Sequence, residues 1–145
     1  MKYVITLFLT IGLALSSFSK SNEIGKDIDV NHYEIHLNEF NITEKSLDAS
    51  TTITFTALNA IDFIELELKS LNVSSVTSDD INVKDFSQND DILKINFAST
   101  LSADSKISLT IDYNGKTFNE QWGGIHWSND YVYNLGVGFD SQPHN

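Results

Sequence analysis

His32, Glu34 and His36, in the segment HYEIH, are side chains of the kinds that bind zinc and transfer protons. In the H-E-x-x-H zinc motif the two histidines share one face of a helix, but here the glutamate stands one place too late. The segment also alternates like a strand, with Tyr33, Ile35 and Leu37 on the other face. Residues four apart on a strand lie roughly 13 Å apart along its axis, which is too far for two imidazoles to bind one ion. A neighbouring pair, His32–Glu34 or Glu34–His36, would need further ligands from elsewhere. We therefore predict a polar outer strand face.

Two acidic pairs, Asp79–Asp80 and Asp90–Asp91, are candidates for a calcium site or a catalytic carboxylate pair. Each pair flanks a short strand beside Ser, Gln or Asn, which is typical of turns. The calcium pattern D-x-[DN]-x-[DN]-G, the nucleophile elbow G-x-S-x-G and a phosphate-binding glycine loop are all missing from the sequence. The sequence therefore predicts that these aspartates are turn residues.

Glycines and large aromatic residues gather in EQWGGIHWSNDYVYNLGVGF, residues 120 to 139. Glycine is favoured where backbones approach closely or where φ is positive. Aromatic rings offer flat faces to sugars, but they also fill corners where two sheets pack. Both interpretations stay open, and the stacking residues of the first would be Trp122, Trp127, Tyr131 and Tyr133.

The elements that must position these residues are strands. Runs with a period of two, rich in β-branched and aromatic residues, occur in NHYEIHL, SLDASTTITFTAL, FIELELKS, LNVSSV, ILKINF and KISLTIDY. The segment NITEK (41–45) is a hairpin loop between the first two runs. No segment after residue 19 has a sustained apolar stripe at helical spacing. We expect an all-β fold, an antiparallel β-sandwich or saddle-like sheet of about seven or more short strands with one face buried.

Composition excludes several classes of function. The chain has 145 residues, nine Lys plus Arg, twenty Asp plus Glu and a formal net charge of −11, which suits one domain. Without a basic patch, binding to nucleic acid or to an anionic membrane surface is not expected. There is no cysteine, so disulfides, thiolate zinc sites and a cysteine nucleophile are excluded.

The first nineteen residues have the form of a secretory signal peptide. Lys2 is followed by an apolar run from Tyr3 to Leu15 and by small residues at Ser17 and Ser19. Thirteen residues are too few to cross a bilayer core as a helix, which takes roughly 17 or more. We expect a signal peptide at 1–19, a mature β domain at 20–145, a secreted or periplasmic location, and no membrane association after cleavage.

Four motifs in order give the chain a family resemblance. DVNHYEIHL, then ITFTALNAIDFIELELKSLNVSSV, then ISLTIDYNGK, then WGGIHW with GVGF together resemble the N-terminal domain of the aminopeptidase N family of zinc metallopeptidases, of the bacterial secreted type. The resemblance covers nearly the whole mature chain.

The resemblance implies an all-β domain that packs against a separate catalytic domain. In that family the catalytic domain holds zinc through H-E-x-x-H and binds the amino group of the peptide through G-x-M-E-N. Both motifs are missing here, so no cofactor and no peptidase activity are expected of this chain alone, and zinc is expected in the parent. The N-terminal domain contributes a Gln or Glu before an R-x-x-[FW]-P-C run, and Gln142 is the candidate for that substrate-binding residue.

The resemblance also implies a role. The chain would supply scaffold and part of the substrate channel of an enzyme that removes amino acids from peptide N-termini. Because DSQPHN resembles the middle of a loop, we expect the sequence to be a fragment, incomplete at its C-terminal end. The alternatives are a stand-alone secreted carbohydrate-binding module that uses the aromatic residues named above, and a remnant that does not fold stably.

Overall fold

The computed structural model describes residues 24–120 and 123–134, and within them the chain forms ten strands in antiparallel sheets. The strands are β1 (Ile28–Asn41), β2 (Ser46–Ala57), β3 (Ile61–Glu67), β4 (Asn72–Thr77), β5 (Val83–Asn89), β6 (Ile92–Leu101), β7 (Lys106–Lys116), β8 (Asn119–Glu120), β9 (Gly123–Trp127) and β10 (Val132–Asn134). This confirms the predicted all-β class. In the same part of the chain, no helix has the length and apolar character needed to cross a membrane.

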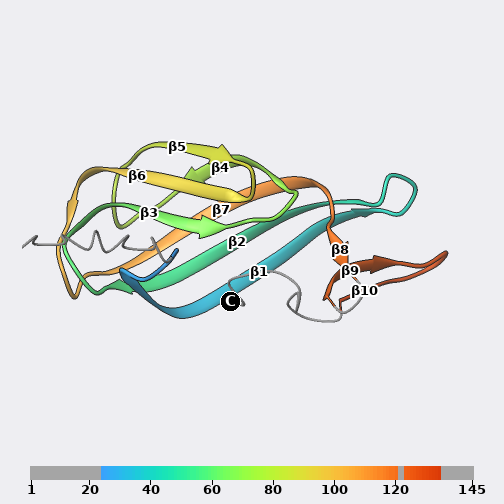
Figure 1. Cartoon of the computed structure of the whole chain (residues 1–145), viewed down its shortest axis with the longest axis horizontal. Helices are drawn as coiled ribbons and strands as arrows, with labels where there is room; N and C mark the ends of the chain where they lie inside the picture. Colours follow the sequence, from blue (N-terminus) through green and yellow to red (C-terminus); the bar gives the residue numbers. More distant parts are fainter. Residues whose placement is uncertain (1–23, 121–122, 135–145) are drawn as a thin grey trace, which may run out of the picture.

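Two sheets form the body of the molecule. A long sheet has the strand order β1-β2-β7-β4, and a shorter sheet has the order β3-β6-β5. A third small sheet, β10-β9-β8, lies at the far end of β1 and β2 (Figure 1). The predicted loop NITEK closes the hairpin from β1 to β2, where the Asn41 side-chain oxygen accepts a hydrogen bond from the Glu44 backbone N–H at 3.0 Å.

The main core lies between the two larger sheets, on the period-two positions of their facing strands. Its buried members are Ile28, Ile53, Phe55, Ala57, Ile61, Ile64, Val76, Leu93, Ile95, Phe97, Leu101, Ile107, Leu109 and Ile111. None of the buried residues in the described ranges is polar or charged. Burying apolar area contributes roughly 25 cal/mol per Å², so this contact supplies most of the force that holds the layers together.

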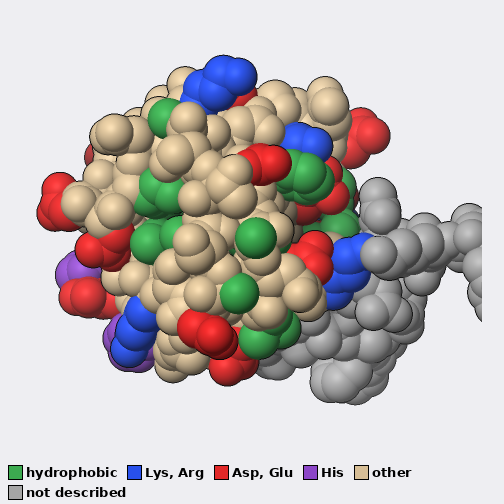
Figure 2. Space-filling model, turned by 90° about the vertical axis from the view of Figure 1, so that its left-hand side faces the viewer, with side chains coloured by type: hydrophobic (Ala, Val, Ile, Leu, Met, Phe, Trp, Pro, Cys, Tyr) green, Lys and Arg blue, Asp and Glu red, His purple; other side chains and the backbone are tan. Residues whose placement is uncertain are grey.

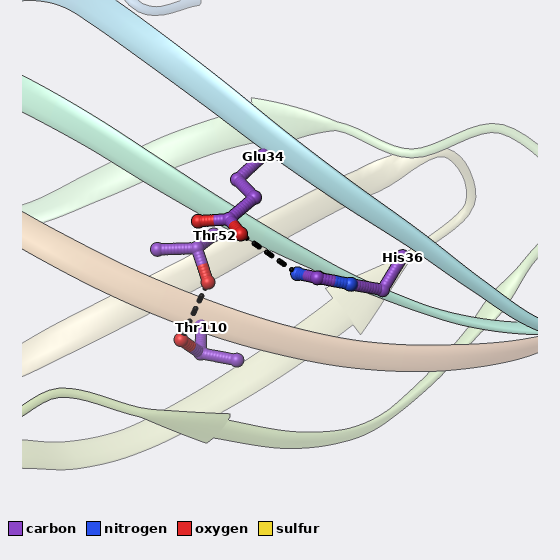
Figure 3. A network of polar contacts seen from close by, with 4 residues as sticks. All are labelled: Glu34, His36, Thr52 and Thr110. Atoms are coloured by element: carbon purple, nitrogen blue, oxygen red, sulfur yellow. Dashed lines mark hydrogen bonds and ion pairs between the residues drawn. The ribbon is translucent and has the colours of Figure 1, made fainter.

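The outer face of the long sheet is rich in hydroxyl groups. Thr52 of β2 is paired in register with Thr110 of β7, and their Oγ1 atoms are 2.9 Å apart. Two residues further along β2, on the same face, Thr54 makes a similar contact with Ser108 of β7 at 3.0 Å. Figure 3 shows Glu34 and His36 of β1 on the same face as Thr52 and Thr110. This face is therefore polar and largely satisfies its own hydrogen bonds.

The charge on the surface is mixed but mainly acidic. Figure 2 shows the end of the molecule at the left of Figure 1, where Asp and Glu side chains are scattered and Lys side chains are fewer. Apolar side chains appear there as small separate patches. This arrangement agrees with the formal net charge of −11.

The strand β1 departs from the expectation of one buried face. Tyr33, Ile35 and Leu37 do share the inner face, because Tyr33 pairs with Ile53, and Leu37 with Ala49. However, they are 54%, 59% and 53% exposed. The shorter sheet packs over the other strands of the long sheet, and β1 runs out from under it after its first residues (Figure 1).

Candidate functional site

The His-Glu-His face of β1 has no geometry for metal binding. The segment is a strand, as predicted, and all three side chains are exposed. His36 Nε2 lies 3.0 Å from Glu34 Oε1, with both side chains about 60% exposed (Figure 3). Across the described residues, no three His, Asp or Glu side chains converge as metal ligands. A surface pair of this kind contributes little to stability.

The acidic pairs lie in turns, as predicted. Asp80 Oδ2 accepts a hydrogen bond from the Ser108 backbone N–H at 2.7 Å, and Asp91 Oδ1 accepts one from the Ser70 N–H at 3.2 Å. Asp90 has a φ of 51°, which suits a turn residue. Asp80 therefore holds its loop to β7, and Asp91 holds its turn to the loop between β3 and β4.

An open depression of about 360 Å³ lies beside Asp80 on the outer face of the long sheet. It is lined by Thr52, Thr77, Ser78, Asp79, Asp80, Ser108 and Thr110. The Thr52–Thr110 pair is already hydrogen-bonded, and Asp80 is bonded to the backbone. The lining contains no histidine or lysine that would serve as a base or nucleophile. The depression is thus a polar surface of hydroxyl and carboxylate groups, several of which are already hydrogen-bonded within the domain.

The hairpin of β9 and β10 carries the described part of the aromatic and glycine-rich stretch, which includes Gly123, Gly124, Trp127, Tyr131 and Tyr133. Gly124 has a φ of +77°, and a Cβ on it would collide with the carbonyl oxygen of Phe118. That same carbonyl accepts a hydrogen bond from the Ile125 N–H at 3.0 Å, so the backbones must approach closely there. Glycine is required for this contact as well as for the positive φ.

The rings of the hairpin fall into two groups. His126 stacks on Tyr133 with ring centroids 5.2 Å apart and an interplanar angle of 14°, and Tyr131 lies 6.0 Å from Tyr133 with a tilt of 36°. Tyr131 and Tyr133 are 61% and 43% exposed. Because the two tyrosine rings are tilted relative to each other, they do not form one flat platform.

Trp127 belongs to the second group, which faces β1. Its indole N–H donates a hydrogen bond to Thr117 Oγ1 at 2.7 Å, and its ring meets Phe40 edge-on with centroids 5.9 Å apart. Trp127 is therefore a packing residue of the end of the long sheet and not an open stacking surface. Its partner Phe40 lies 87 positions earlier (127 − 40), and sequence reasoning did not link the two.

Two of the sequence-predicted site residues, Gln142 and Trp122, lie outside the described residues. The substrate-binding role of Gln142 stays a prediction. The described residues bring together a two-sheet scaffold, an aromatic hairpin and an apolar strand face.

Residues 29–138 match the family model described as the Peptidase M1 N-terminal domain. No curated protein matches the chain.

Three solved structures have the same fold. An M1 zinc metallopeptidase mutant from Deinococcus radiodurans, bound to a Tyr-Ser-Ala substrate, matches with a TM-score of 0.66 and 22% identity over 81% of this chain and 27% of that chain. An M1 zinc metallopeptidase from Deinococcus radiodurans matches with a TM-score of 0.66 and 22% identity over 76% of this chain and 26% of that chain. A two-domain M1 zinc metallopeptidase mutant bound to L-tryptophan matches with a TM-score of 0.67 and 22% identity over 82% of this chain and 28% of that chain.

The chain spans about a quarter of the length of these solved structures, for example 27% of the first. At this level of identity the likeness shows a shared fold. The family match, by contrast, runs from the start of β1 to beyond β10. The chain therefore belongs to the family of Peptidase M1 N-terminal domains, which confirms its resemblance to the N-terminal domain of the aminopeptidase N family.

Proposed function

We propose that this chain is the non-catalytic N-terminal β domain of a secreted, zinc-dependent aminopeptidase that removes amino acids from peptide N-termini. The observation that carries the proposal is the family match over residues 29–138, which includes the two-sheet body and the aromatic hairpin. The structural relatives are zinc metallopeptidases, one of which holds a Tyr-Ser-Ala substrate and another L-tryptophan. A peptide substrate in one relative and a single amino acid in another are consistent with cleavage next to an N-terminus.

Within such an enzyme we assign scaffolding to this chain and the chemistry to the catalytic domain. The described residues do not fit a resident zinc ion, because no three candidate ligands converge. Zinc therefore belongs to the catalytic domain of the parent. The chain contributes a rigid two-layer body, and the hairpin and the region of Gln142 are our candidates for the wall of the substrate channel.

The experiment compares this chain with the parent enzyme. The purified 145-residue chain and the full product of the encoding gene are assayed for release of an amino acid from an aminoacyl-anilide. We expect activity in the full product alone, and we expect a zinc chelator to abolish it. Chelator-sensitive activity in the 145-residue chain, or a full product that is inactive on every aminoacyl-anilide, would refute the proposal.

The proposed role of Gln142 is to accept a hydrogen bond from the free amino group of the peptide substrate. In the parent enzyme, Gln142→Ala is expected to raise KM for the aminoacyl-anilide, while Gln142→Glu, which keeps an oxygen acceptor, retains substrate binding. Equal KM values for Gln142→Ala and the unchanged enzyme would show that Gln142 does not bind the substrate.

The proposed domain limits and secretion rest on residues 1–19. Expression of the encoding gene in its native host should yield a mature protein that begins at Lys20 outside the cytoplasm. N-terminal sequencing of the mature protein checks this, and a cytoplasmic protein that retains Lys2 would contradict it.

A further inference from the structure

Two segments of the sequence match N-x-[ST], the acceptor pattern for N-linked glycosylation. They are Asn41-Ile42-Thr43 and Asn72-Val73-Ser74. In an exported protein such a pattern is an attachment site for a glycan when it lies in an accessible surface loop. The structure places the two patterns in different surroundings, and the first of them has the features that an acceptor needs.

Asn41 lies at the tip of the hairpin of β1 and β2, away from the two-sheet body (Figure 1). It is the last residue of β1, and its pairing with Ser46 closes the ladder between the two strands. All residues from 38 to 45 are exposed. An enzyme can therefore reach this loop without opening the fold.

The side chain of Asn41 leaves its amide nitrogen available. Its Oδ1 atom accepts the hydrogen bond from the Glu44 N–H at 3.0 Å. Because the oxygen and the nitrogen of an amide group diverge from one carbon, Nδ2 points away from that contact. Within the described part of the chain, neither Nδ2 of Asn41 nor the hydroxyl group of Thr43 takes part in a hydrogen bond. Both groups that a transferase binds in this pattern, the amide and the hydroxyl two residues later, are thus accessible.

Asn72 differs because its segment belongs to a strand. It is the first residue of β4, which pairs with β7. Its Nδ2 atom lies close to Gly115, where an added Cβ would be 3.3 Å away from it. The hydroxyl group of Ser74 donates a hydrogen bond to the backbone carbonyl of Asp112 at 3.1 Å. A transferase could therefore bind this segment only after β4 had separated from β7.

Charge also distinguishes the two patterns. The exposed Glu39 stands two residues before Asn41, whereas Ser70 stands at the same place before Asn72. A carboxylate beside the acceptor gives a transferase a group to hold through an arginine side chain. The apolar side chain of Ile42, next to Asn41, is 45% exposed, and a hydrated glycan at Asn41 would shield it.

We propose that Asn41 is an N-glycosylation site, at which the folded chain receives an oligosaccharide from a polyprenyl-pyrophosphate carrier after export. In this transfer, Nδ2 of Asn41 forms a bond to C1 of the first sugar and loses one proton. The bond between C1 and the pyrophosphate oxygen breaks, and the pyrophosphate leaves with the electron pair. The hydroxyl group of Thr43 binds the transferase and is not itself changed. The inference rests on the proposed function for the export of the chain.

Transfer to the purified chain tests the site directly. The folded 145-residue chain is incubated with a bacterial single-subunit oligosaccharyltransferase and its lipid-linked oligosaccharide. Intact mass gives the modified fraction, and mass spectrometry of peptides locates the glycan. We expect one glycan per chain, at Asn41. Asn41→Gln should lower the modified fraction at least tenfold, whereas the matched control Asn72→Gln should leave it unchanged.

A second pair of variants keeps the hydrogen bond between Asn41 and Glu44. Thr43→Ser retains the hydroxyl group and should remain an acceptor, whereas Thr43→Val should lower the modified fraction at least tenfold. A synthetic peptide of residues 37–46 is included in the same reaction. A modified peptide beside an unmodified folded chain would overturn the proposal, because the fold would then hide Asn41. Absence of transfer to both, or transfer to Asn72 at the level of Asn41, would overturn it as well.

The protein from its native host separates this inference from the proposed function. The peptide that contains Asn41 should carry a glycan in the exported product. An exported, active aminopeptidase with an unmodified Asn41 refutes the glycosylation inference alone. A glycan at Asn41 in an exported product without peptidase activity refutes the proposed function alone.

Discussion

The inner face of the long sheet has two halves. The closed half is covered by the shorter sheet, whereas the open half, on β1, is exposed, and the boundary between them runs between paired residues of β1 and β2. Ile53 of β2 is 1% exposed, while its cross-strand partner Tyr33 of β1 is 54% exposed. Both side chains are apolar and both point to the same side of the sheet. The alternation of a sequence therefore decides which face a residue occupies, but a second layer decides whether that face is buried.

The largest contrast between the halves should appear when one apolar side chain is shortened in each. Leu109→Ala, in the closed half, removes a side chain that is 0% exposed and leaves a cavity, and it should cost about 2–5 kcal/mol of unfolding free energy. Ile35→Ala, in the open half, should change that free energy by about 0.5 kcal/mol or less. Urea unfolding of the 145-residue chain measures both.

A cooperative urea transition of the unchanged chain is the necessary baseline for this comparison. Its presence would count against the interpretation of the chain as a remnant that does not fold. A large loss of stability from Ile35→Ala would mean that the apolar side chains of Tyr33, Ile35 and Leu37 are already covered within this chain, and the distinction between the halves would then fail.

The hairpin at the open end gives the next largest effect. Gly124→Ala forces a side chain into a positive φ, which costs about 1–2 kcal/mol, and adds a collision with the backbone of Phe118. We expect this variant to lose hydrogen-exchange protection in residues 123–134 while the main core keeps its own.

Gly25→Ala is the matched control for the hairpin. Gly25 also has a positive φ, +74°, but an added Cβ would meet nothing within 4 Å. Gly25→Ala should therefore lose only the free energy that a positive φ costs, and the amides of the hairpin should keep their protection against hydrogen exchange. Equal behaviour of the two variants would mean that the contact between Gly124 and Phe118 does not hold the hairpin in place.

The strands of the closed half were predictable because their apolar residues keep a strict period of two. Leu93, Ile95 and Phe97 of β6 are an example, and all three are buried. The strand β5 was not predicted, because its apolar residues Val83 and Phe86 are three positions apart. A bulge between Val83 and Asp85 restores both to the inner side, and sequence periodicity alone does not reveal a bulge.

The candidate site was less predictable, because its contacts are long-range. Periodicity placed His32 and Glu34 on one polar face of a strand, and the structure confirms that this strand face is exposed. It did not show that Trp127 packs on Phe40, since that contact depends on how the hairpin folds back to the end of β1. The exposure of Tyr33, Ile35 and Leu37 could not be predicted either, because these residues alternate with polar ones like those of a buried strand.

A smaller effect is expected on the outer face of the closed half, where stability rests on polar pairs. Thr52→Val removes the hydrogen bond to Thr110 and should cost about 0.5–1.5 kcal/mol. Thr110→Val and the double variant complete a mutant cycle by urea unfolding. We expect the double variant to lose less than the sum of the single losses, and strict additivity would show that the pair contributes no coupling.

The smallest expected effect concerns Glu67, at the end of β3 in the covering sheet. Partial burial raises the pKa of this carboxyl group above its ordinary value, the nearby Asp91 raises it further, and Lys69 opposes the shift. A carboxyl whose pKa is higher in the folded state destabilises the fold where it is ionised, and this cost disappears as the pH falls through the raised pKa. Glu67→Gln should therefore stabilise the chain slightly at pH 7 and leave it unchanged in acid below the ordinary pKa of glutamate.

The control Glu65→Gln removes a partly exposed ion pair with Lys94, 3.6 Å long, and should have a small effect of the opposite sign. If Glu67→Gln lowers the urea midpoint at pH 7, then the ionised carboxylate of Glu67 stabilises the fold, and its favourable contacts outweigh the destabilising effects of burial and Asp91.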